Sequence, residues 1–225
     1  MLTKEIQEII AASKTAGWVL EPEAKRLFST TGLDVPRFIW AQKLKEAVLF
    51  AEEIGYPVVA KIVSPKVIHK SEVKGVSVGI DSDEKLKEAF ERFSRIEGFA
   101  GVLVEEMLGG IEVIVGAKVD YQFGPVILFG LGGTAVEIYR DVTLRMAPLG
   151  QKDAESMVRC LKARSLLEGY RGREPVNLDE LTRMLKTFSD VVMDLETEIE
   201  SIDLNPVICT SRRCVVADAR IMLKK

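Results

Sequence analysis

The stretch "GYPVVAKIVSPKVIHKSEVKGVSVGI", residues 55–80, contains two apolar runs separated by a polar segment. It begins with an apolar run rich in Val and Ile, which is typical of a buried strand, and it ends with a second such run, "GVSVGI". The segment between the two runs is rich in Ser, Pro, Lys and Gly, which predicts an exposed loop. This loop contains His69, the only histidine of the chain. The stretch therefore predicts two strands that hold one histidine-bearing loop.

Two side chains of this stretch could carry chemistry. Lys61 lies in the first predicted strand, where all of its neighbours are apolar, so its ammonium group must reach either solvent or an anion. Taken alone, a half-exposed strand lysine is the commoner case. His69 has the same ambiguity, because a lone histidine in a polar loop is most often a solvated bystander. Neutral imidazole is, however, also a good nucleophile near neutral pH.

The sequence on either side of this stretch predicts a mixture of helices and strands. Regular alternation of strand and helix along the chain would be typical of a Rossmann-like domain. The middle and the end of this chain instead contain consecutive strands that would pair as antiparallel hairpins, so we predict the fold class α+β (mixed α/β). The expected helices are residues 2–17, 20–32, 42–55, 82–98, 152–163 and 177–196, with Asn177 as an N-cap, and the further strands are residues 34–41, 101–107, 111–119, 125–131, 142–149, 198–208 and 213–221.

A weak boundary at "GFAG", residues 98–101, divides the chain into two expected lobes. The first lobe, residues 1–98, would hold the His69 loop. The second lobe, residues 99–225, would hold most of the acidic positions. A chain of 225 residues is long enough for two such lobes that share a surface.

The composition excludes several classes of protein. The chain is 47% hydrophobic and 29% charged, which is ordinary for a globular protein, and its net charge of −3 argues against a nucleic-acid binder. No apolar run approaches the ~20 residues that cross a bilayer, and the N-terminus lacks the apolar core of a signal peptide. We therefore expect a cytoplasmic protein without a membrane segment. Three cysteines without a CxxC pair and a single histidine argue against zinc, so buried or incidental thiols are favoured.

Carboxylates and glycines mark two further candidate places. Glu105, Glu106 and Glu112 lie where one predicted strand ends and the next begins, which fits either a polar hairpin turn or a hinge that binds a base and its ribose. The turn "GLGGT", residues 130–134, would let backbone N–H groups approach an anion closely. It matches neither a Walker A loop nor GxGxxG, so it is a weak signal by itself. The charged residues that follow this turn are Glu137, Arg140, Asp141 and Arg145.

The last two predicted strands contain a candidate metal site. Asp203 and Asn205 have i, i+2 spacing and so share one face of a strand. Asp218 lies in an apolar strand that could pair with the first one across a polar turn. Three oxygen ligands on neighbouring strands suit Mg²⁺, which prefers a few protein ligands together with water and phosphate. As isolated facts, these residues fit ordinary turn positions equally well.

Taken together and in this order, the motifs resemble an ATP-grasp domain. More narrowly, they resemble the β subunit of the ADP-forming acyl-CoA (acetyl-CoA) synthetases, which are related to succinyl-CoA synthetase. The resemblance spans about residues 20–220 and implies an ATP-grasp fold of two lobes with the nucleotide bound between them. It rests on "GYPVVAKIVSPKVIHKSEVKGV", "VLVEEML", "FGPVILFGLGGTAVEIYRDVTLRMAPL" and "IDLNPV" followed by "VVADAR".

The resemblance implies a role for each matching residue. His69 would relay a phosphoryl group as a phosphohistidine. Lys61 would contact the nucleotide phosphates, and Arg145 would lie on the phosphate side. The adenine and ribose would be bound by Glu105, Glu106 and Met107 with Glu112 nearby, and Mg²⁺ by Asp203, Asn205 and Asp218.

The resemblance also implies a reaction and a partner. The family reaction is acyl-CoA + ADP + phosphate ⇌ acid + ATP + CoA, with Mg²⁺ as cofactor and ATP or ADP as substrate. The chain has no stretch typical of a CoA-binding Rossmann unit and no second histidine. We therefore expect a CoA-binding α subunit in an α₂β₂ heterotetramer, through which acyl-CoA and phosphate would enter.

Two departures from the family pattern and two alternatives qualify this interpretation. The family pattern has two glycines before the valine, whereas this chain has Lys74 and Gly75, and Thr134 replaces a more usual apolar residue. One alternative is a subunit of a succinate- or malate-CoA ligase. The other is a non-catalytic nucleotide-binding regulatory module.

Overall fold

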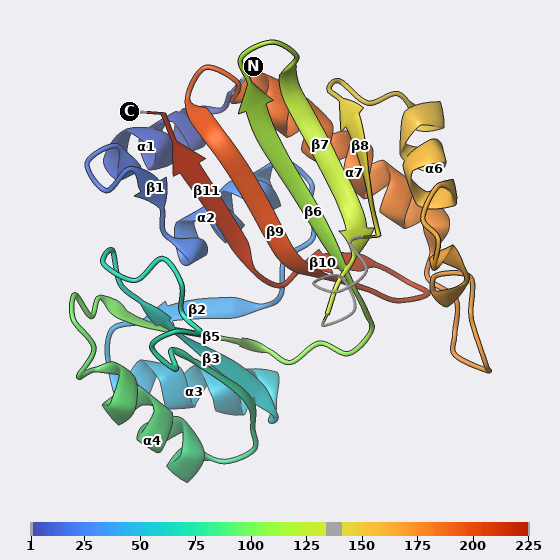
Figure 1. Ribbon diagram of the computed structural model, residues 1–225. Coiled ribbons are helices and arrows are strands. Elements are labelled where there is room, and N and C mark those ends of the chain that lie inside the picture. Colours follow the sequence, from blue (N-terminus) through green and yellow to red (C-terminus); the bar gives the residue numbers. More distant parts are fainter. Residues whose placement is uncertain (1, 134–140, 225) are drawn as a thin grey trace. The chain divides into compact units, whose positions relative to one another are not determined.

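The computed structural model describes residues 2–133 and 141–224, which fold as two compact units (Figure 1). The first unit comprises Met1–Val35 and Gly109–Lys225, and the second comprises Pro36–Leu108. The division that we expected after residue 98 differs from these units. Strand β5 (Gly101–Glu106) pairs with β2 (Phe38–Ala41) and β3 (Val58–Val63), so hydrogen bonds hold it in the second unit.

The second unit is an antiparallel sheet with helices on one face. Its strand order is β2-β5-β3-β4, where β4 is Val76–Ile80, and the helices are α3 (Leu44–Ile54) and α4 (Asp83–Phe93). The core between them contains Val58, Ala60 and Ile62, which are alternate residues of β3, together with Leu86 and Phe93 of α4. Side chains of a strand alternate between faces, so Val59 and Lys61 belong to the other face of this sheet.

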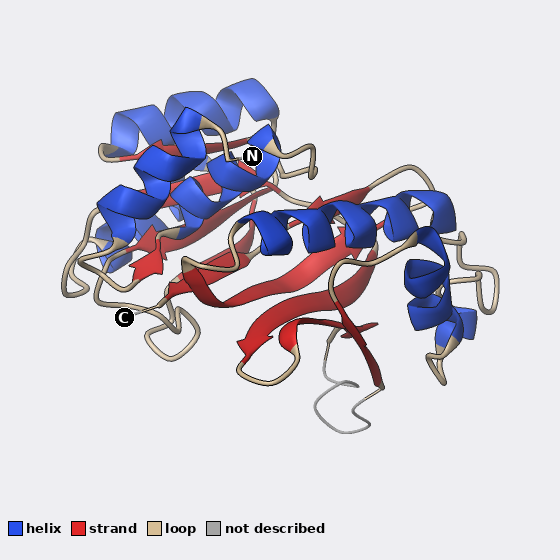
Figure 2. Cartoon of the chain, turned by 90° about the horizontal axis from the view of Figure 1, so that it is seen from above, coloured by secondary structure: helices blue, strands red, loops and turns tan. Residues whose placement is uncertain are grey.

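The first unit contains a longer antiparallel sheet and the remaining helices. Its strands run in the order β1 (Trp18–Val19), β11 (Ala219–Leu223), β9 (Ile199–Cys209), β6 (Ile111–Asp120), β7 (Gly124–Leu131) and β8 (Val142–Met146), and β10 (Cys214–Val216) also pairs with β9. The helices are α1 (Lys4–Ser13), α2 (Glu21–Thr30), α6 (Gln151–Arg159) and α7 (Leu178–Asp194), with a short 3₁₀ turn at Arg164–Leu166. Figure 2 shows the long helix α7 lying along one side of these strands. One face of the sheet therefore packs into the core with the helices.

Local sequence signals account for most of these elements. The side chain of Thr3 accepts a hydrogen bond from the Ile6 backbone N–H, and Asn177 does the same for Glu180, so both residues cap helices as expected. The strand expected at 213–221 is in fact two strands, β10 and β11. The break lies opposite Pro206, whose carbonyl accepts from Ala217 and Asp218 but which has no N–H to donate to the ladder.

Among residues 2–133 and 141–224, no helix is long and apolar enough to cross a bilayer.

Candidate functional site

A buried ion pair lies on the face of the smaller sheet that points away from helices α3 and α4. The ammonium of Lys61 on β3 lies 2.8 Å from a carboxylate oxygen of Glu105 on β5, and the two side chains are only 7% and 4% exposed. Glu105 lies directly opposite Val59, so it meets Lys61 diagonally across the two strands. Lys61 is therefore not the half-exposed strand lysine of the simpler interpretation: its charge is buried and faces an anion.

The two residues after Glu105 lie at the end of β5. The Glu106 carboxylate accepts a hydrogen bond from the backbone N–H of Arg37 at 3.1 Å and lies 3.6 Å from the Arg37 guanidinium. The Glu106 N–H in turn donates to the Arg37 carbonyl. Met107 is 44% exposed. The end of the strand is thus held by Arg37, while Met107 presents an apolar side chain to solvent.

His69 lies in the predicted loop between β3 and β4, and its side chain is exposed. Neighbouring Ile68 and Val73 are also exposed, at 38% and 40%, although both are apolar. Val67 is buried and packs against the core of the unit, so the loop is anchored just before the histidine. The fold therefore presents one imidazole on a loop with two exposed apolar neighbours.

Specific contacts hold both ends of this loop. At the first end, the Ser64 hydroxyl donates to the Glu97 carbonyl at 2.8 Å. Next to it, the hydrogen bond from the Lys66 ammonium lowers the pKa of the Glu97 carboxyl. At the second end, the Gly75 carbonyl accepts from Ile62 at 2.8 Å, and a Cβ at Gly75 would lie only 2.4 Å from an Ile62 methyl group. These contacts define where the loop begins and ends.

Lys74, the departure from the family's glycine pattern, has a left-handed backbone conformation with φ 51°. Glycine adopts this conformation without a steric penalty, whereas a residue with a Cβ is disfavoured there by ~1 kcal/mol. Glycine would therefore suit the backbone conformation that Lys74 adopts here.

In the first unit, two of the three predicted metal ligands, Asp203 and Asn205, lie on β9, whereas Asp218 lies in the break between β10 and β11 and not within a strand as expected. Asp203 and Asn205 alternate with the buried Ile202 and Leu204, so they lie on the sheet face away from the helix-side core. Asp218 precedes β11, and its N–H donates to the carbonyl of Pro206, which places its backbone beside that of Asn205. The expected pairing of the two strands is thus present in the structure.

Arg220 is a charged member of this face that the sequence motifs did not single out. It lies directly opposite Asp203, and the guanidinium is 3.0 Å from the Asp203 carboxylate. The i, i+2 spacing of Asp218 and Arg220 was the available signal, because it places both on one face. On its other side Asp203 faces Gly116, which has no side chain to cover the carboxylate.

The donor types at this position fit a hard cation. Carboxylate and amide oxygens are the ligands of Mg²⁺, which also retains water and phosphate oxygens. No group of three or more His, Cys, Asp or Glu side chains in the described part of the chain could hold a metal ion. A magnesium site here would therefore depend on two carboxylates and the Asn205 amide, completed by oxygens from a nucleotide.

Glu112 lies in the first unit, at the start of β6 and next to the glycine-rich turn. The Gly132 N–H donates to the Glu112 carbonyl at 2.7 Å, and a Cβ at Gly132 would lie 2.8 Å from the Cβ of Glu112. A side chain at position 132 would thus collide with the strand. The structure brings Glu112 to the turn, whereas Thr134, Glu137 and Arg140 lie outside the described residues.

Arg145 lies on the opposite face of the larger sheet from Asp203 and Asn205. It faces Ile127, a core residue, and its guanidinium donates to the Ser156 hydroxyl of α6 at 2.9 Å. This contact directs the Arg145 side chain to the helix side of β8. Asp141 is likewise engaged, because it accepts hydrogen bonds from the N–H groups of Lys162 and Ala163.

Removal of the Lys61 charge should destabilise the protein. We expect Lys61→Met to lower the free energy of unfolding by ~3–5 kcal/mol, because the Glu105 carboxylate would stay buried without its ammonium partner. The double variant Lys61→Met/Glu105→Leu should recover most of this loss, since it removes both charges. Urea denaturation of the full chain measures both values. The exposed pair Lys85–Asp81 provides the control, and Lys85→Met should leave stability unchanged. A double variant as unstable as the single one would contradict the role of the pair.

Substitutions at two adjacent positions at the end of the loop, Lys74 and Gly75, should differ in their effect on stability. We expect Gly75→Ala to destabilise the protein by ~1–3 kcal/mol, because the new methyl group would collide with Ile62. Lys74→Gly should be tolerated within ~1 kcal/mol, because glycine accepts the left-handed conformation. Urea denaturation and the rate of loop cleavage by proteinase K measure the two effects. Equal effects of the two substitutions would be evidence against this assignment of the loop end.

Comparisons with known proteins agree with this architecture. The family model for the ATP-grasp domain matches residues 10–223. The chain is 42% identical over 226 residues to the β subunit of acetate–CoA ligase [ADP-forming] I from Pyrococcus furiosus, a match that covers 96% of this chain and 97% of that one.

Solved structures of a related enzyme share the fold. The dinucleotide-forming acetyl-coenzyme A synthetase 1 of Ca. Korarchaeum cryptofilum, in complex with coenzyme A and Ca-AMPCP, has a TM-score of 0.90 and 41% identity, and the match covers 97% of this chain and 99% of that chain. A second structure of that enzyme, with coenzyme A and Mg-AMPPCP, has its phosphohistidine segment pointing towards the nucleotide-binding site; its TM-score is 0.84 at 41% identity, with the same coverage. The chain therefore belongs to the ATP-grasp family, among the β subunits of the ADP-forming acetate–CoA ligases.

Proposed function

We propose that this chain is the β subunit of an ADP-forming acyl-CoA synthetase, with acetyl-CoA as the first substrate to test. In this role it binds Mg-ADP or Mg-ATP and relays a phosphoryl group through His69. The observation that carries the proposal is the exposed His69 on a loop that continues directly from the strand with the buried Lys61. A nucleophile that must receive and deliver a group needs this exposure, whereas a cation for phosphate needs a site shielded from water.

The proposed transfer balances as two displacements on phosphorus. First, a ring nitrogen of His69 attacks the phosphoryl group that arrives from the partner subunit, and the bond to its previous carrier breaks. A β-phosphate oxygen of ADP then attacks the same phosphorus, the N–P bond breaks and ATP forms with a free imidazole. The anchored ends at Ser64 and Gly75 let the segment between them move as one loop.

Several of the predicted residues would contact the nucleotide or its metal ion. Lys61 would donate to phosphate oxygens, and Glu105 would hold its ammonium in place when no phosphate is bound. Glu106 and Met107 would contact the base and ribose, with Glu112 nearby. Asp203, Asn205 and Asp218 would hold Mg²⁺, which supplies charge neutralisation on the phosphate oxygens. We leave Arg145 out of this site because of its contact with Ser156.

The proposal includes a partner that binds CoA. The β-subunit name of the Pyrococcus relative and the coenzyme A in the Korarchaeum structures support an α subunit that handles acyl-CoA and phosphate. We propose an α₂β₂ heterotetramer in the cytoplasm. The exposed apolar Ile68 and Val73 beside His69 suit a loop that must also enter a partner's site.

Loss of His69 should abolish turnover without loss of the nucleotide. We expect His69→Ala, co-expressed with the α subunit, to lower ATP formation from acetyl-CoA, ADP and phosphate by at least ~1,000-fold, because no acceptor for the phosphoryl group remains. ADP affinity, measured by calorimetry, should stay within about twofold. Ser71→Ala, a change at another exposed residue of the same loop, is the matched control and should retain activity.

A labelling experiment separates the relay from other roles of His69. Incubation of the wild-type enzyme with γ-³²P-ATP should label the chain with an acid-labile, base-stable phosphate that His69→Ala lacks. Normal turnover in His69→Ala would refute the relay. Absence of activity with acetyl-CoA but labelling of His69 would keep the relay and exclude acetyl-CoA as the substrate.

The proposed magnesium ligands predict a selective loss of nucleotide affinity. We expect Asp218→Asn and Asn205→Ala each to weaken Mg-ADP binding by about tenfold or more, because each removes one oxygen ligand or its charge. Asp190→Asn, which changes an exposed carboxylate on α7, is the control and should have no effect. Calorimetry in the presence and absence of Mg²⁺ measures the change. Unchanged Mg-ADP affinity in both variants would remove these residues from the site.

A further inference from the structure

Two cysteines face each other across the hairpin formed by β9 and β10. Cys209 and Cys214 are direct partners in the antiparallel register. The next pair towards the turn, Thr210 and Arg213, is hydrogen-bonded, because the Thr210 N–H donates to the Arg213 carbonyl at 2.9 Å. Bonded and non-bonded pairs alternate along an antiparallel ladder, so Cys209 and Cys214 form a non-hydrogen-bonded pair with Cα atoms ~4.5 Å apart. Disulfides span Cα distances of about 4.4–6.8 Å, so this pair lies within the range.

The two thiols are buried and interact with each other. Cys209 is 1% exposed and Cys214 is 5% exposed, and both are free thiols. The hydrogen bond to Cys214, together with burial, raises the pKa of the Cys209 thiol. The Cys209 thiol is therefore less acidic than an ordinary cysteine. Neither residue belongs to the site proposed for nucleotide or magnesium.

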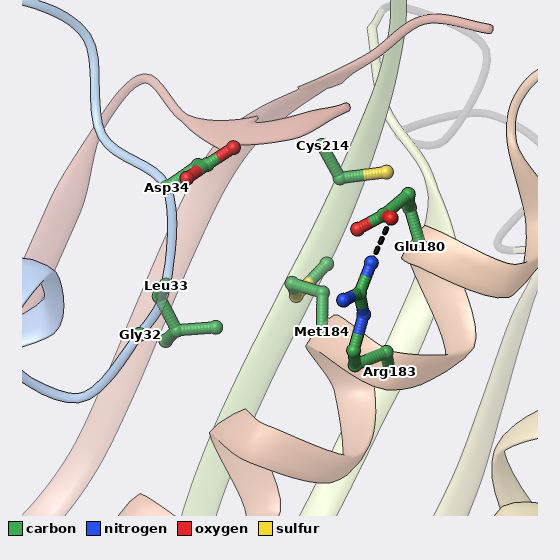
Figure 3. A pocket seen from close by; sticks show the side chains of 7 residues that line it. All are labelled: Gly32, Leu33, Asp34, Glu180, Arg183, Met184 and Cys214. Atoms are coloured by element: carbon green, nitrogen blue, oxygen red, sulfur yellow. Dashed lines mark ion pairs between the residues drawn. The ribbon is translucent and has the colours of Figure 1, made fainter. Parts of the chain in front are cut away.

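A small pocket gives one of the two sulfurs a route to solvent. The pocket has a volume of about 160 Å³ and is lined by Cys214, Met184, Glu180, Arg183 and the segment Gly32–Asp34. Figure 3 shows the Cys214 side chain directed into it from the hairpin, beside the ion pair of Glu180 and Arg183. A small reagent that enters the pocket thus meets Cys214 before Cys209.

We propose that Cys209 and Cys214 form a dithiol–disulfide site that reacts with small organic disulfides through this pocket. In the first step the Cys214 sulfur attacks one sulfur of the reagent RSSR, the S–S bond of the reagent breaks, and one RSH leaves with the proton from Cys214. In the second step Cys209 attacks the Cys214 sulfur of the mixed disulfide, and the second RSH leaves with the proton from Cys209. The two cysteines are oxidised and the reagent is reduced to two thiols.

Oxidation would link the two strands of this hairpin covalently. Two of the proposed magnesium ligands flank the linked segment: Asn205 lies before Cys209 on β9, and Asp218 lies after β10. The carbonyl of Thr210, inside the closed segment, also accepts from the N-cap residue Asn177 of α7 at 2.9 Å. The disulfide would constrain the short segment from Cys209 to Cys214 in the unfolded chain, which should raise the midpoint of thermal unfolding by roughly 3–8 °C. This effect is independent of the proposed function.

Peptide mapping of the full chain tests the site. The reduced native protein is incubated with oxidised glutathione, quenched with N-ethylmaleimide, denatured and digested with trypsin. Trypsin cleaves after Arg212 and Arg213, so Cys209 and Cys214 fall on separate peptides that only a disulfide can join. We expect one linked pair that contains these two cysteines, and the exposed Cys160 should be modified by glutathione alone.

Variants identify the order of the two steps. Cys209→Ser should stop at a glutathione adduct on Cys214, without the rise in thermal midpoint, whereas Cys214→Ser should leave Cys209 unmodified. Cys160→Ser should still form the linked pair. Two unmodified cysteines in wild-type protein, or a lasting glutathione adduct on Cys214 in wild-type protein, would overturn the proposal. The wild-type map decides these outcomes even where a serine variant fails to fold.

Discussion

The alternation of side chains along a strand is the constraint on which the candidate site depends. In both units helices pack against one face of an antiparallel sheet, so every second strand residue is committed to an apolar core. Ala60 and Ile62 enter the core of the smaller unit, and Lys61 between them must face the other way. Leu204 enters the core of the larger unit, so Asp203 and Asn205 on either side of it face the other way. The helices thus determine which face of each sheet presents charge.

The two charged pairs on these faces differ in their surroundings. Lys61 and Glu105 are almost completely buried, so their attraction is strong and the loss of either partner is costly. Asp203 and Arg220 are 45% and 29% exposed, which leaves their attraction screened by water. The buried pair therefore orders the sheet in addition to any role with phosphate, whereas the exposed pair leaves Asp203 available to exchange its partner. This difference is consistent with a cation bound next to Asp203.

The His69 loop combines fixed ends with an exposed centre. Ser64 is bonded to the carbonyl of Glu97, and Gly75 packs too closely against Ile62 to accept a side chain. Between these ends the histidine and its apolar neighbours face solvent. Lys74 adopts a left-handed conformation at the loop end, which glycine adopts without a steric penalty.

Local sequence patterns were sufficient for the type of most elements, for the helix caps at Thr3 and Asn177 and for the shared face of Asp203 and Asn205, because each depends on residues a few positions apart. They did not predict the short strand β1 or the break between β10 and β11. The order of several weak motifs identified the family, although no single motif was specific. Four contacts became visible only in the folded chain: Lys61 with Glu105, Arg145 with α6, Cys209 with Cys214, and β5 with β2 and β3. These contacts depend on strand register and on the helices that cover each sheet. Register arises from pairing between distant segments, and periodicity within one segment does not contain it.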